Sequence, residues 1–227
     1  MGDARHDTMW SNGFRRAVAA AACVIGCAGT PGAFSAQADE EFAKAEKMVR
    51  EGDMVRAMTT LRRLAAAGYA PAQARMGQLL DAAEENEAAA TLYRQAAEQG
   101  NAEGVYGLGA MYAAGDGMAR DQAQALHWMR VAAEGGHIQA VSFLAQAYLA
   151  GDPVLKGQPD FDAQTLLWAE RAAQTDFVPA MDALARIYRD GGYGVAPDPA
   201  RAQAWAQRAQ AARRAVAGAA AQEEGQR

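Results

Sequence analysis

The sequence is poor in the side chains that carry most enzyme chemistry. Its 227 residues include two cysteines and three histidines, and the serines after residue 30 are Ser35 and Ser142, neither in a Gly-x-Ser-x-Gly or Ser-x-x-Lys motif. Neither His127 nor His137 is accompanied by a cysteine, so no metal site is expected. The turn at residues 115–117 lacks the lysine and the preceding strand of a phosphate-binding loop. We therefore predict no catalytic residue, no metal site and no cofactor.

Aromatic residues and basic stretches are also scarce. Aromatics make up 7% of the chain, and the 51% share of hydrophobic residues comes largely from alanine. Alanine-rich segments with leucine and methionine and few β-branched residues favour helix over strand. The net charge is −5 and no stripe is dense in lysine and arginine, which argues against nucleic acid as a partner. The composition thus indicates an all-α protein.

The N-terminal residues have the organisation of an export signal. Arg15–Arg16 precede an uncharged apolar run at residues 17–29, and residues 36–38 (Ala-Gln-Ala) offer the small side chains of a cleavage site. The run is too short to span a bilayer, which needs about 20 apolar residues. We predict a signal peptide over residues 1–38, cleaved after Ala38, and a periplasmic or secreted mature protein.

Two alternatives remain open for this segment. The residues before Cys27 resemble a weak lipobox, which would make Cys27 a lipidated N-terminus and the protein a lipoprotein subunit of an envelope assembly complex. A buried alanine-rich helix is the other alternative. Soluble export is favoured because the lipobox lacks its usual leucine, and either Met1 or Met9 fits as the start. Cleavage after Ala38 would remove Cys23 and Cys27, so the mature chain would have no disulfide.

The segments that flank the centre of the chain are predicted to be helical. Residues 39–67 carry apolar side chains at three- and four-residue steps, interrupted at Gly52, and Asp53 is placed to cap the second of two helices. We interpret them as a divergent helical hairpin that caps the N-terminal end. Residues 213–227 are predicted to be a fraying helix followed by a polar tail.

A pattern of small and large residues recurs four times between these segments. With Gly68, Gly100, Gly136 and Asp176 in register, the units are residues 68–99, 100–135, 136–175 and 176–212. Eight positions after the first residue of each unit stands an apolar residue, and a small residue comes directly after it. These pairs are Met76–Gly77, Leu108–Gly109, Leu144–Ala145 and Leu184–Ala185. Three positions further stand Leu80, Tyr112, Tyr148 and Tyr188. Such spacing lets two helices approach closely and predicts a stack of helix hairpins.

The second helix of each unit repeats as well. One large residue occupies the same place in each unit, as Leu92, Trp128, Trp168 and Trp205. Because the register is fixed, we predict that the three tryptophans fill equivalent core positions. Asp121 and Asp198 are predicted to cap second helices at their N-termini, and Gly100 and Gly136 to follow helix C-termini in the left-handed conformation.

The unit at residues 100–135 resembles a Sel1-like repeat, a relative of the tetratricopeptide repeat. It contains Leu-Gly-x2-Tyr-x2-Gly-x-Gly, an aspartate, a tryptophan and a closing Ala-Ala pair. The other units depart from this pattern: Leu92 replaces tryptophan in the first, Thr165 replaces alanine in the third, and Asp176 opens the fourth. The resemblance covers residues 68–212. It implies a right-handed α-solenoid of antiparallel helix hairpins that acts by binding other proteins.

The resemblance also implies that the first helices line a concave surface. Packing leaves three positions free on each of these helices. They lie two residues before, two residues after and five residues after the residue equivalent to Met76. The predicted binding residues at these positions are Tyr106, Ala110, Ser142, Gln146, Asp182, Arg186 and Arg189, and Phe143, next to Ser142, is added to them. Tyr106 and Phe143 would supply aromatic anchors, and Arg186 and Arg189 a charged end. An ordinary solvated face is the alternative.

The repeats and the leader together predict an exported, non-catalytic scaffold or regulator that binds a protein or peptide partner. The resemblance adds envelope or polysaccharide regulation as its setting. The alternative is a peptidoglycan- or β-lactam-directed enzyme. That hypothesis predicts convergent polar side chains in a pocket, with Ser142 or Asp182 beside a base.

Overall fold

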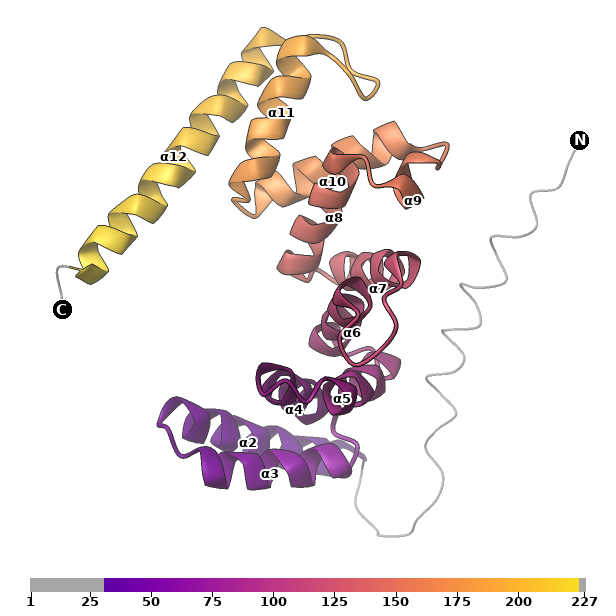
Figure 1. The fold of residues 1–227 in the computed structure, drawn as a ribbon. Coiled ribbons are helices and arrows are strands. Elements are labelled where there is room, and N and C mark those ends of the chain that lie inside the picture. Colours follow the sequence, from indigo (N-terminus) through magenta and orange to yellow (C-terminus); the bar gives the residue numbers. More distant parts are fainter. Residues whose placement is uncertain (1–30, 225–227) are drawn as a thin grey trace, which may run out of the picture.

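The structure, a computed structural model, describes residues 31–224, and every regular element there is a helix (Figure 1). The helices are α2 (Pro31–Arg50), α3 (Met54–Ala66), α4 (Ala70–Ala82), α5 (Asn86–Glu98), α6 (Ala102–Ala114), α7 (Gln122–Glu134), α8 (Ile138–Ala150), α9 (Pro153–Lys156), α10 (Phe161–Gln174), α11 (Val178–Asp190) and α12 (Pro199–Glu224). Within these residues, an isolated bridge between Gly192 and Val195 is the only strand-like pairing. The predicted all-α class is confirmed.

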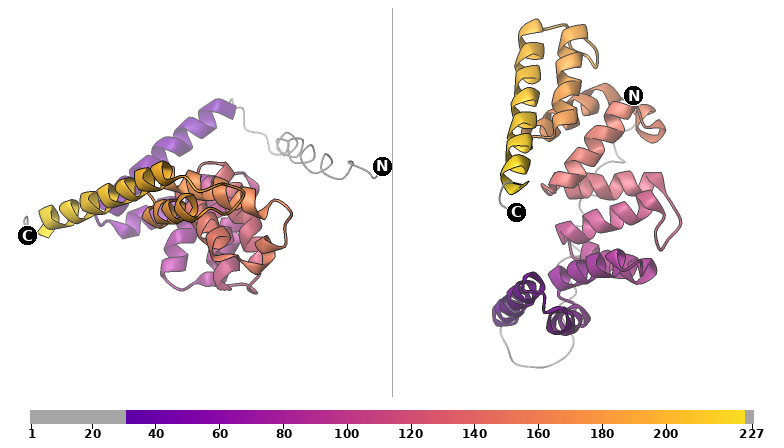
Figure 2. Two further views of the ribbon diagram at one scale, coloured as in Figure 1. Left: turned by 90° about the horizontal axis from the view of Figure 1, so that it is seen from above. Right: turned by 60° about the vertical axis from the view of Figure 1, so that its left-hand side comes forward.

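The long helices pair as hairpins, and the hairpins stack in sequence order. The pairs are α2 with α3, α4 with α5, α6 with α7, α8 with α10, and α11 with α12. Figures 1 and 2 show an elongated, curved array with α2 and α3 at one end and α11 and α12 at the other. The predicted α-solenoid of helix hairpins is therefore confirmed.

Aspartates cap several of the helices from the turns before them. The Asp121 carboxylate accepts hydrogen bonds from the backbone N–H groups of Ala123 and Gln124 at the start of α7, both at 3.0 Å. Asp198 accepts from the N–H of Arg201 at 3.0 Å, where α12 begins. These bonds satisfy donors that have no partner inside the helix, so the predicted caps are present.

Two glycines show why the turns are so tight. Gly136 follows α7 with a φ of +88°, a left-handed conformation that glycine adopts without strain. Gly117, in the loop after α6, has a steric reason as well. A Cβ there would lie 2.3 Å from the carbonyl oxygen of Asn86 in α5. The loop after α6 therefore packs closely on the preceding unit.

The three repeat tryptophans are not equally buried. Trp168 is 2% exposed and lies inside the main core, whereas Trp128 and Trp205 are half-buried and pack against that core. A mostly apolar hollow of about 560 Å³ opens beside Trp128, and Trp205 lies in the last repeat unit of the described residues, where no following unit packs on it. The prediction of equivalent core positions is thus correct in full only for Trp168.

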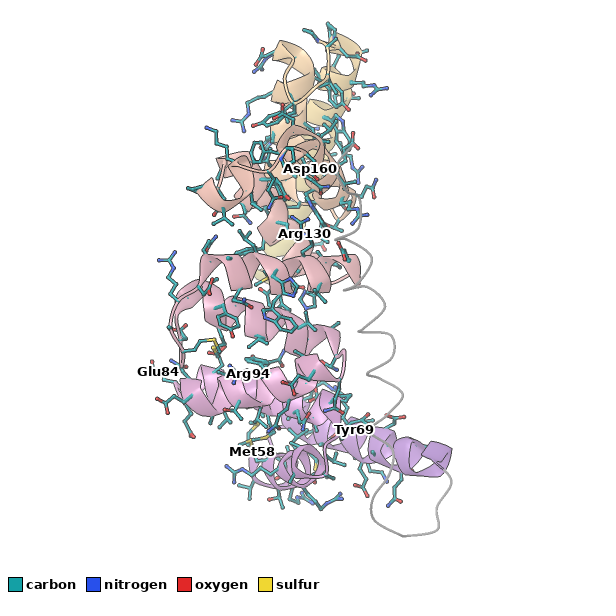
Figure 3. All side chains as sticks on the ribbon, turned by 90° about the vertical axis from the view of Figure 1, so that its right-hand side faces the viewer. Met58, Tyr69, Glu84, Arg94, Arg130 and Asp160 are labelled. Carbon is teal, nitrogen blue, oxygen red and sulfur yellow. The ribbon has the colours of Figure 1, made fainter. Side chains whose placement is uncertain are left out.

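The tyrosines of the first helices link successive units by hydrogen bonds. Arg130 lies between the second and third units (Figure 3), and its guanidinium donates to the Tyr148 hydroxyl at 2.6 Å. In the next unit, the Tyr188 hydroxyl donates to the Glu170 carboxylate at 3.0 Å. Both tyrosine rings are buried, so the aromatic position fills space and orders the stack at once.

The N-terminal hairpin begins earlier than the predicted mature chain. Helix α2 starts at Pro31, and Ala38 is 5% exposed in a cluster with Leu61 and Leu64 of α3. Residues 1–30, with Arg15–Arg16 and both cysteines, lie outside the described residues, so the leader and the lipidation alternative remain predictions. In the part that the structure describes, no helix is long and apolar enough to cross a membrane.

The C-terminal helix continues through most of the predicted tail. Helix α12 runs without a break from Pro199 to Glu224. Its first half packs on α11 with Ala202 and Ala209 buried, and Arg213 forms an ion pair with Asp182 of α11. Residues 214–219 of the same helix are exposed to solvent.

Candidate functional site

The first helices of the four units lie on the inner side of the curve. Helix α4 packs directly on α6, and α8 on α11, whereas no pair of second helices among the described residues is in comparable contact. Elements that come closer together occupy the inside of a curved stack. We call the solvent-accessible surface of α4, α6, α8 and α11 the first-helix face.

The two predicted aromatic anchors on this face are half-buried. Tyr106 and Phe143 both pack against the main core. The Tyr106 ring stacks on the His137 ring, with centroids 4.3 Å apart and planes 16° from parallel. His137 Nε2 lies 3.2 Å from a carboxylate oxygen of Glu103. Tyr106 is therefore held in a fixed orientation, and part of its surface reaches solvent.

The predicted charged end of the face is partly neutralised. The Arg189 guanidinium donates to Asp190 at 3.0 Å, and this hydrogen bond raises the pKa of Arg189 and lowers that of Asp190. Asp182 is paired with Arg213 of α12. Arg186 is exposed and lines a hollow of about 240 Å³ between α8 and α11. Only Arg186 of the two predicted arginines is left for a partner.

The predicted residues do not converge on one site. Ala110 shares a cavity with Tyr106, Ser142 is half-buried on α8, and Gln146 is exposed one turn later. Arg186 lines the separate hollow next to α11. The structure thus divides the predicted surface into an α6 part, an α8 part and an α11 part.

One hollow on the first-helix face lies between α4 and α6. This α4–α6 cavity has a volume of about 420 Å³, within the roughly 300–1,000 Å³ typical of binding pockets. Its lining includes Gln78, Asp81, Tyr93, Glu103, Tyr106 and Ala110. Two carboxylates and two phenols therefore surround one cavity.

Tyr93 reaches this cavity from a second helix. Its ring lies against Gly77 of α4 and Gly107 of α6, where an added Cβ would come within 2.9 Å and 2.4 Å of ring carbons. The two glycines leave the space that the ring fills. Tyr93 is only 4% exposed, yet it lines the α4–α6 cavity. Its phenol crosses from the outer layer of helices to the inner one.

The electrostatics of the cavity are dominated by negative charge. Partial burial, and then the nearby charge of Asp116, raise the pKa of the Asp81 carboxyl. Burial, with Glu103 nearby, raises the pKa of Tyr106, and burial with Asp81 and Glu103 raises that of Tyr93. Both tyrosines therefore keep their hydroxyl protons at neutral pH.

The cations near the cavity are already occupied. The Arg75 guanidinium donates to Glu46 at 2.8 Å and to the Gln78 side-chain oxygen at 2.9 Å. The Gln78 amide donates in turn to Glu103. No hydrogen bond or ion pair in the described residues involves the Asp81 side chain.

A second hollow adjoins the first across the Gln78–Glu103 hydrogen bond. It has a volume of about 310 Å³, and its lining combines the apolar residues Phe42, Pro71 and Ala74 with polar and charged ones that include Glu46, Arg75 and Asn101. Gln78 and Glu103 line both hollows. Together the two hollows form a groove from α2 to α6, mixed in character at the α2 end and acidic at the α6 end.

Sequence analysis missed the acidic part of this groove. The rule that selected Tyr106 and Ala110 also selects Ala74, Gln78 and Asp81 when it is applied to the first unit. The repeat pattern of that unit is the weakest of the four. Tyr93 carried no such signal, because its access to the inner face depends on Gly107 in another helix.

The residues expected of an enzyme are not assembled in the part of the chain described. Ser142 has no side-chain hydrogen bond to a base, and Asp182 is engaged with Arg213. Among residues 31–224, no three His, Cys, Asp or Glu side chains are grouped closely enough to hold a metal ion. The arrangement that would support the enzyme alternative is therefore not found there.

The fold and the groove define a class: a helix-hairpin solenoid with its first helices on the inner face. A family model for the Sel1 repeat matches residues 70–101, 102–137, 138–174 and 178–209. The chain belongs to the Sel1 repeat family, and the resemblance inferred from sequence is confirmed.

Solved structures of bacterial Sel1 repeat proteins are similar to this chain. A Sel1 repeat protein from Oxalobacter formigenes is 28% identical, with a TM-score of 0.64, over 79% of this chain and 75% of the other. A protective antigen of uropathogenic Escherichia coli strains, which displays the Sel1-like repeat fold, is 26% identical with a TM-score of 0.68. The match covers 79% of this chain but only 39% of the antigen.

A third structure supports the fold alone. It is a putative Sel1 repeat protein from Klebsiella pneumoniae, 20% identical over 81% of this chain and 90% of the other, with a TM-score of 0.50. A search of curated proteins gives no match.

Proposed function

We propose that the protein is an exported, non-catalytic scaffold that binds an extended segment of another protein in the groove between α2, α4 and α6. The α4–α6 cavity is the observation that carries this proposal. Stacking of the repeats does not require Asp81 or the Tyr93 hydroxyl, yet both line a cavity on the inner face. Side chains that the fold does not need, gathered in a concave site, are candidates for recognition.

The proposed setting is the bacterial envelope, in regulation of envelope or polysaccharide machinery. Two observations support it. The N-terminal residues have the composition of a leader, and the similar solved structures come from bacteria. The partner in this proposal is a protein or peptide, and no cofactor takes part.

Site-specific photo-crosslinking in intact cells of the native host tests the binding face. The crosslinking amino acid is introduced at Ala110 in the α4–α6 cavity, and separately at Gln146 on the exposed part of α8. Matched control positions are Ala88 on α5 and Gln124 on α7, both exposed on second helices. We expect a defined crosslinked product from Ala110, a weaker one from Gln146, and none from the controls.

Two results would contradict the proposal. Equal crosslinking from Ala88 and Gln124 would move the interaction to the outer surface. A lack of crosslinks from Ala110, while a full-length complex is still recovered by native purification, would exclude the α4–α6 cavity from binding.

A further inference from the structure

Among the described residues that line the α4–α6 cavity, Asp81 and Glu103 carry carboxylates and none is a lysine or arginine. Asp81 and Glu103 face it, and Asp116 lies near enough to disfavour ionisation of Asp81. Arg75 is held by Glu46 at 2.8 Å, and His137 contacts Glu103 from behind the Tyr106 ring. Asp81 is exposed overall, but it forms no ion pair among the described residues, and it lines the cavity together with Glu103 and near Asp116. This arrangement of carboxylates favours a positive charge in the cavity.

An independent observation comes from the Tyr93 hydroxyl. More than nine-tenths of the Tyr93 side chain is buried, and its hydroxyl makes no hydrogen bond with the described residues. The hydroxyl oxygen is still accessible to solvent. Among the described residues, the only fully buried side-chain nitrogen or oxygen without a hydrogen-bond partner is His137 Nδ1, and not the Tyr93 oxygen. The hydroxyl therefore opens into the α4–α6 cavity. A nearly buried polar group without a partner is free to bind a ligand.

The chemistry of these groups selects a hydrogen-bond donor with positive charge. Carboxylates only accept hydrogen bonds, and a phenol oxygen accepts them as well. Lysine and arginine side chains only donate, and their long stems can extend into a cavity while the main chain remains outside. A neutral side chain would leave the charge of Asp81 and Glu103 uncompensated, and an acidic one would be repelled.

We propose that the α4–α6 cavity receives a lysine or arginine side chain from the protein segment bound in the groove. The cation is held between the Asp81 and Glu103 carboxylates, with the Tyr93 hydroxyl at its inner end. This inference rests on the proposed function and adds the chemical class of the partner to it.

The neighbouring hollow extends the recognition to a second residue. Phe42, Pro71 and Ala74 form the apolar part of its wall, beside Glu46, Arg75 and Asn101, and it meets the α4–α6 cavity at the Gln78–Glu103 hydrogen bond. An apolar side chain close in sequence to the basic residue would occupy it. The structure thus assigns a partner segment in which a basic residue and an apolar residue are near neighbours.

A soluble library of octapeptides, blocked at both ends, tests this specificity. Immobilised protein is incubated with the library, and the enrichment of each residue type in bound peptides is measured. The wild type is compared with Asp81→Asn, with Asp81→Asn/Glu103→Gln and with Tyr93→Phe. Glu98→Gln/Asp162→Asn is the matched control, since it removes the same charge from exposed positions on α5 and α10. Circular dichroism spectra and melting temperatures show that each variant is folded.

We expect the wild type to enrich peptides that contain lysine or arginine. Charge-assisted hydrogen bonds are among the strong ones, so the double variant should bind the best peptide at least about tenfold more weakly. Asp81→Asn and Tyr93→Phe should each give a smaller loss, and the control should bind like the wild type. Replacing the basic residue of that peptide with norleucine should abolish the difference between wild type and double variant.

The outcomes that overturn the inference are distinct from those that overturn the proposed function. Enrichment of peptides without a basic residue, unchanged in the double variant, rejects the cation and leaves the binding groove in place. Binding of spermidine but of no peptide assigns the cavity to a small cation and also rejects the inference. If neither peptides nor crosslinks from Ala110 are obtained, both proposals are wrong.

Discussion

At the scale of single residues, Tyr93 and Gly107 depend on each other. A Cβ at Gly107 would lie 2.4 Å from two carbons of the Tyr93 ring, closer than any packed contact allows. We expect Gly107→Ala to destabilise the protein by about 1–3 kcal/mol, because overpacking outweighs the gain in helix propensity. Thermal and urea unfolding followed by circular dichroism measures the change.

Two further variants separate overpacking from other causes. Gly218→Ala, in exposed α12 with nothing within 4 Å of the added Cβ, should be neutral or slightly stabilising. In Tyr93→Ala/Gly107→Ala the clash is absent, so the added methyl should cost much less than it does in the wild type. Equal effects of Gly107→Ala with and without the tyrosine ring would contradict the packing described above.

Replacing Asp81 is expected to stabilise the protein, whereas Gly107→Ala is expected to destabilise it. Its pKa is raised in the folded protein, so the ionised form opposes folding at neutral pH, and this effect disappears once the pH falls below the ordinary range of an aspartate. Asp81→Asn should therefore raise the melting temperature slightly at pH 7 and leave it unchanged near pH 3. Asp190→Asn serves as the contrast, since Arg189 lowers the pKa of Asp190 and no gain is expected there. A lower melting temperature for Asp81→Asn at pH 7 would contradict the electrostatic picture.

Residues with local roles could be predicted from the sequence. Asp121 caps α7 as expected, because a cap needs only its own next three residues. Tyr106 was predicted as a residue of the inner face, but its stacking on His137 was not foreseen, because His137 belongs to the next unit. Contacts between units depend on how the hairpins are rotated against each other, and the repeat pattern does not specify that rotation.

At the scale of elements, the insertion in the third unit is held by one side chain. Helix α9 is four residues long, begins at the Asp152 cap, and buries Leu155 to 1% exposure. We expect Leu155→Ala to cost about 2–5 kcal/mol, as for other truncations of fully buried leucine. The adjacent Val154 is 44% exposed, so Val154→Ala should change stability by less than about 0.5 kcal/mol. Chemical denaturation of both variants tests whether α9 is anchored or only a surface loop.

The terminal elements show where pattern analysis stops. Helix α12 runs to Glu224 although its sequence after Ala212 keeps no repeat pattern, because an alanine-rich segment continues a helix once the first half is packed. Trp205 in the same helix follows the pattern yet is only half-buried. Helix formation is a local property here, whereas the burial of a side chain depends on the elements that pack around it.

At the scale of the whole molecule, the solenoid form followed from the repeat length, and the groove did not. Gly68, Gly100, Gly136 and Asp176 set the unit boundaries, and stacked hairpins are the structure that buries their common face. The α4–α6 cavity lies where the first repeat unit, whose pattern is weak, meets the second unit, whose pattern is regular. Departures from the repeat, such as Tyr93 and Asp81, are therefore the residues through which this member of the family can acquire its own partner.

The N-terminal end gives the last prediction, the site of leader removal. Cleavage after Ala38 would remove the first eight residues of α2 as the structure has it, including the buried Ala38 side chain. Phe42, Ala45 and Val49 would remain and still pack on α3, so the hairpin should persist with a loss of about 1 kcal/mol. We expect the protein purified from the envelope fraction of its native host to have the mass of residues 39–227.

Two measurements make this prediction decisive. Recombinant chains that begin at Pro31 and at Asp39 should show the same amide-exchange protection over the second half of α2, because that half carries the contacts with α3. A mature mass equal to residues 27–227 plus lipid would establish Cys27 as the anchor instead. A mass that retains residues 1–38 would show that the apolar run is no leader, and would remove the main support for a role in the envelope.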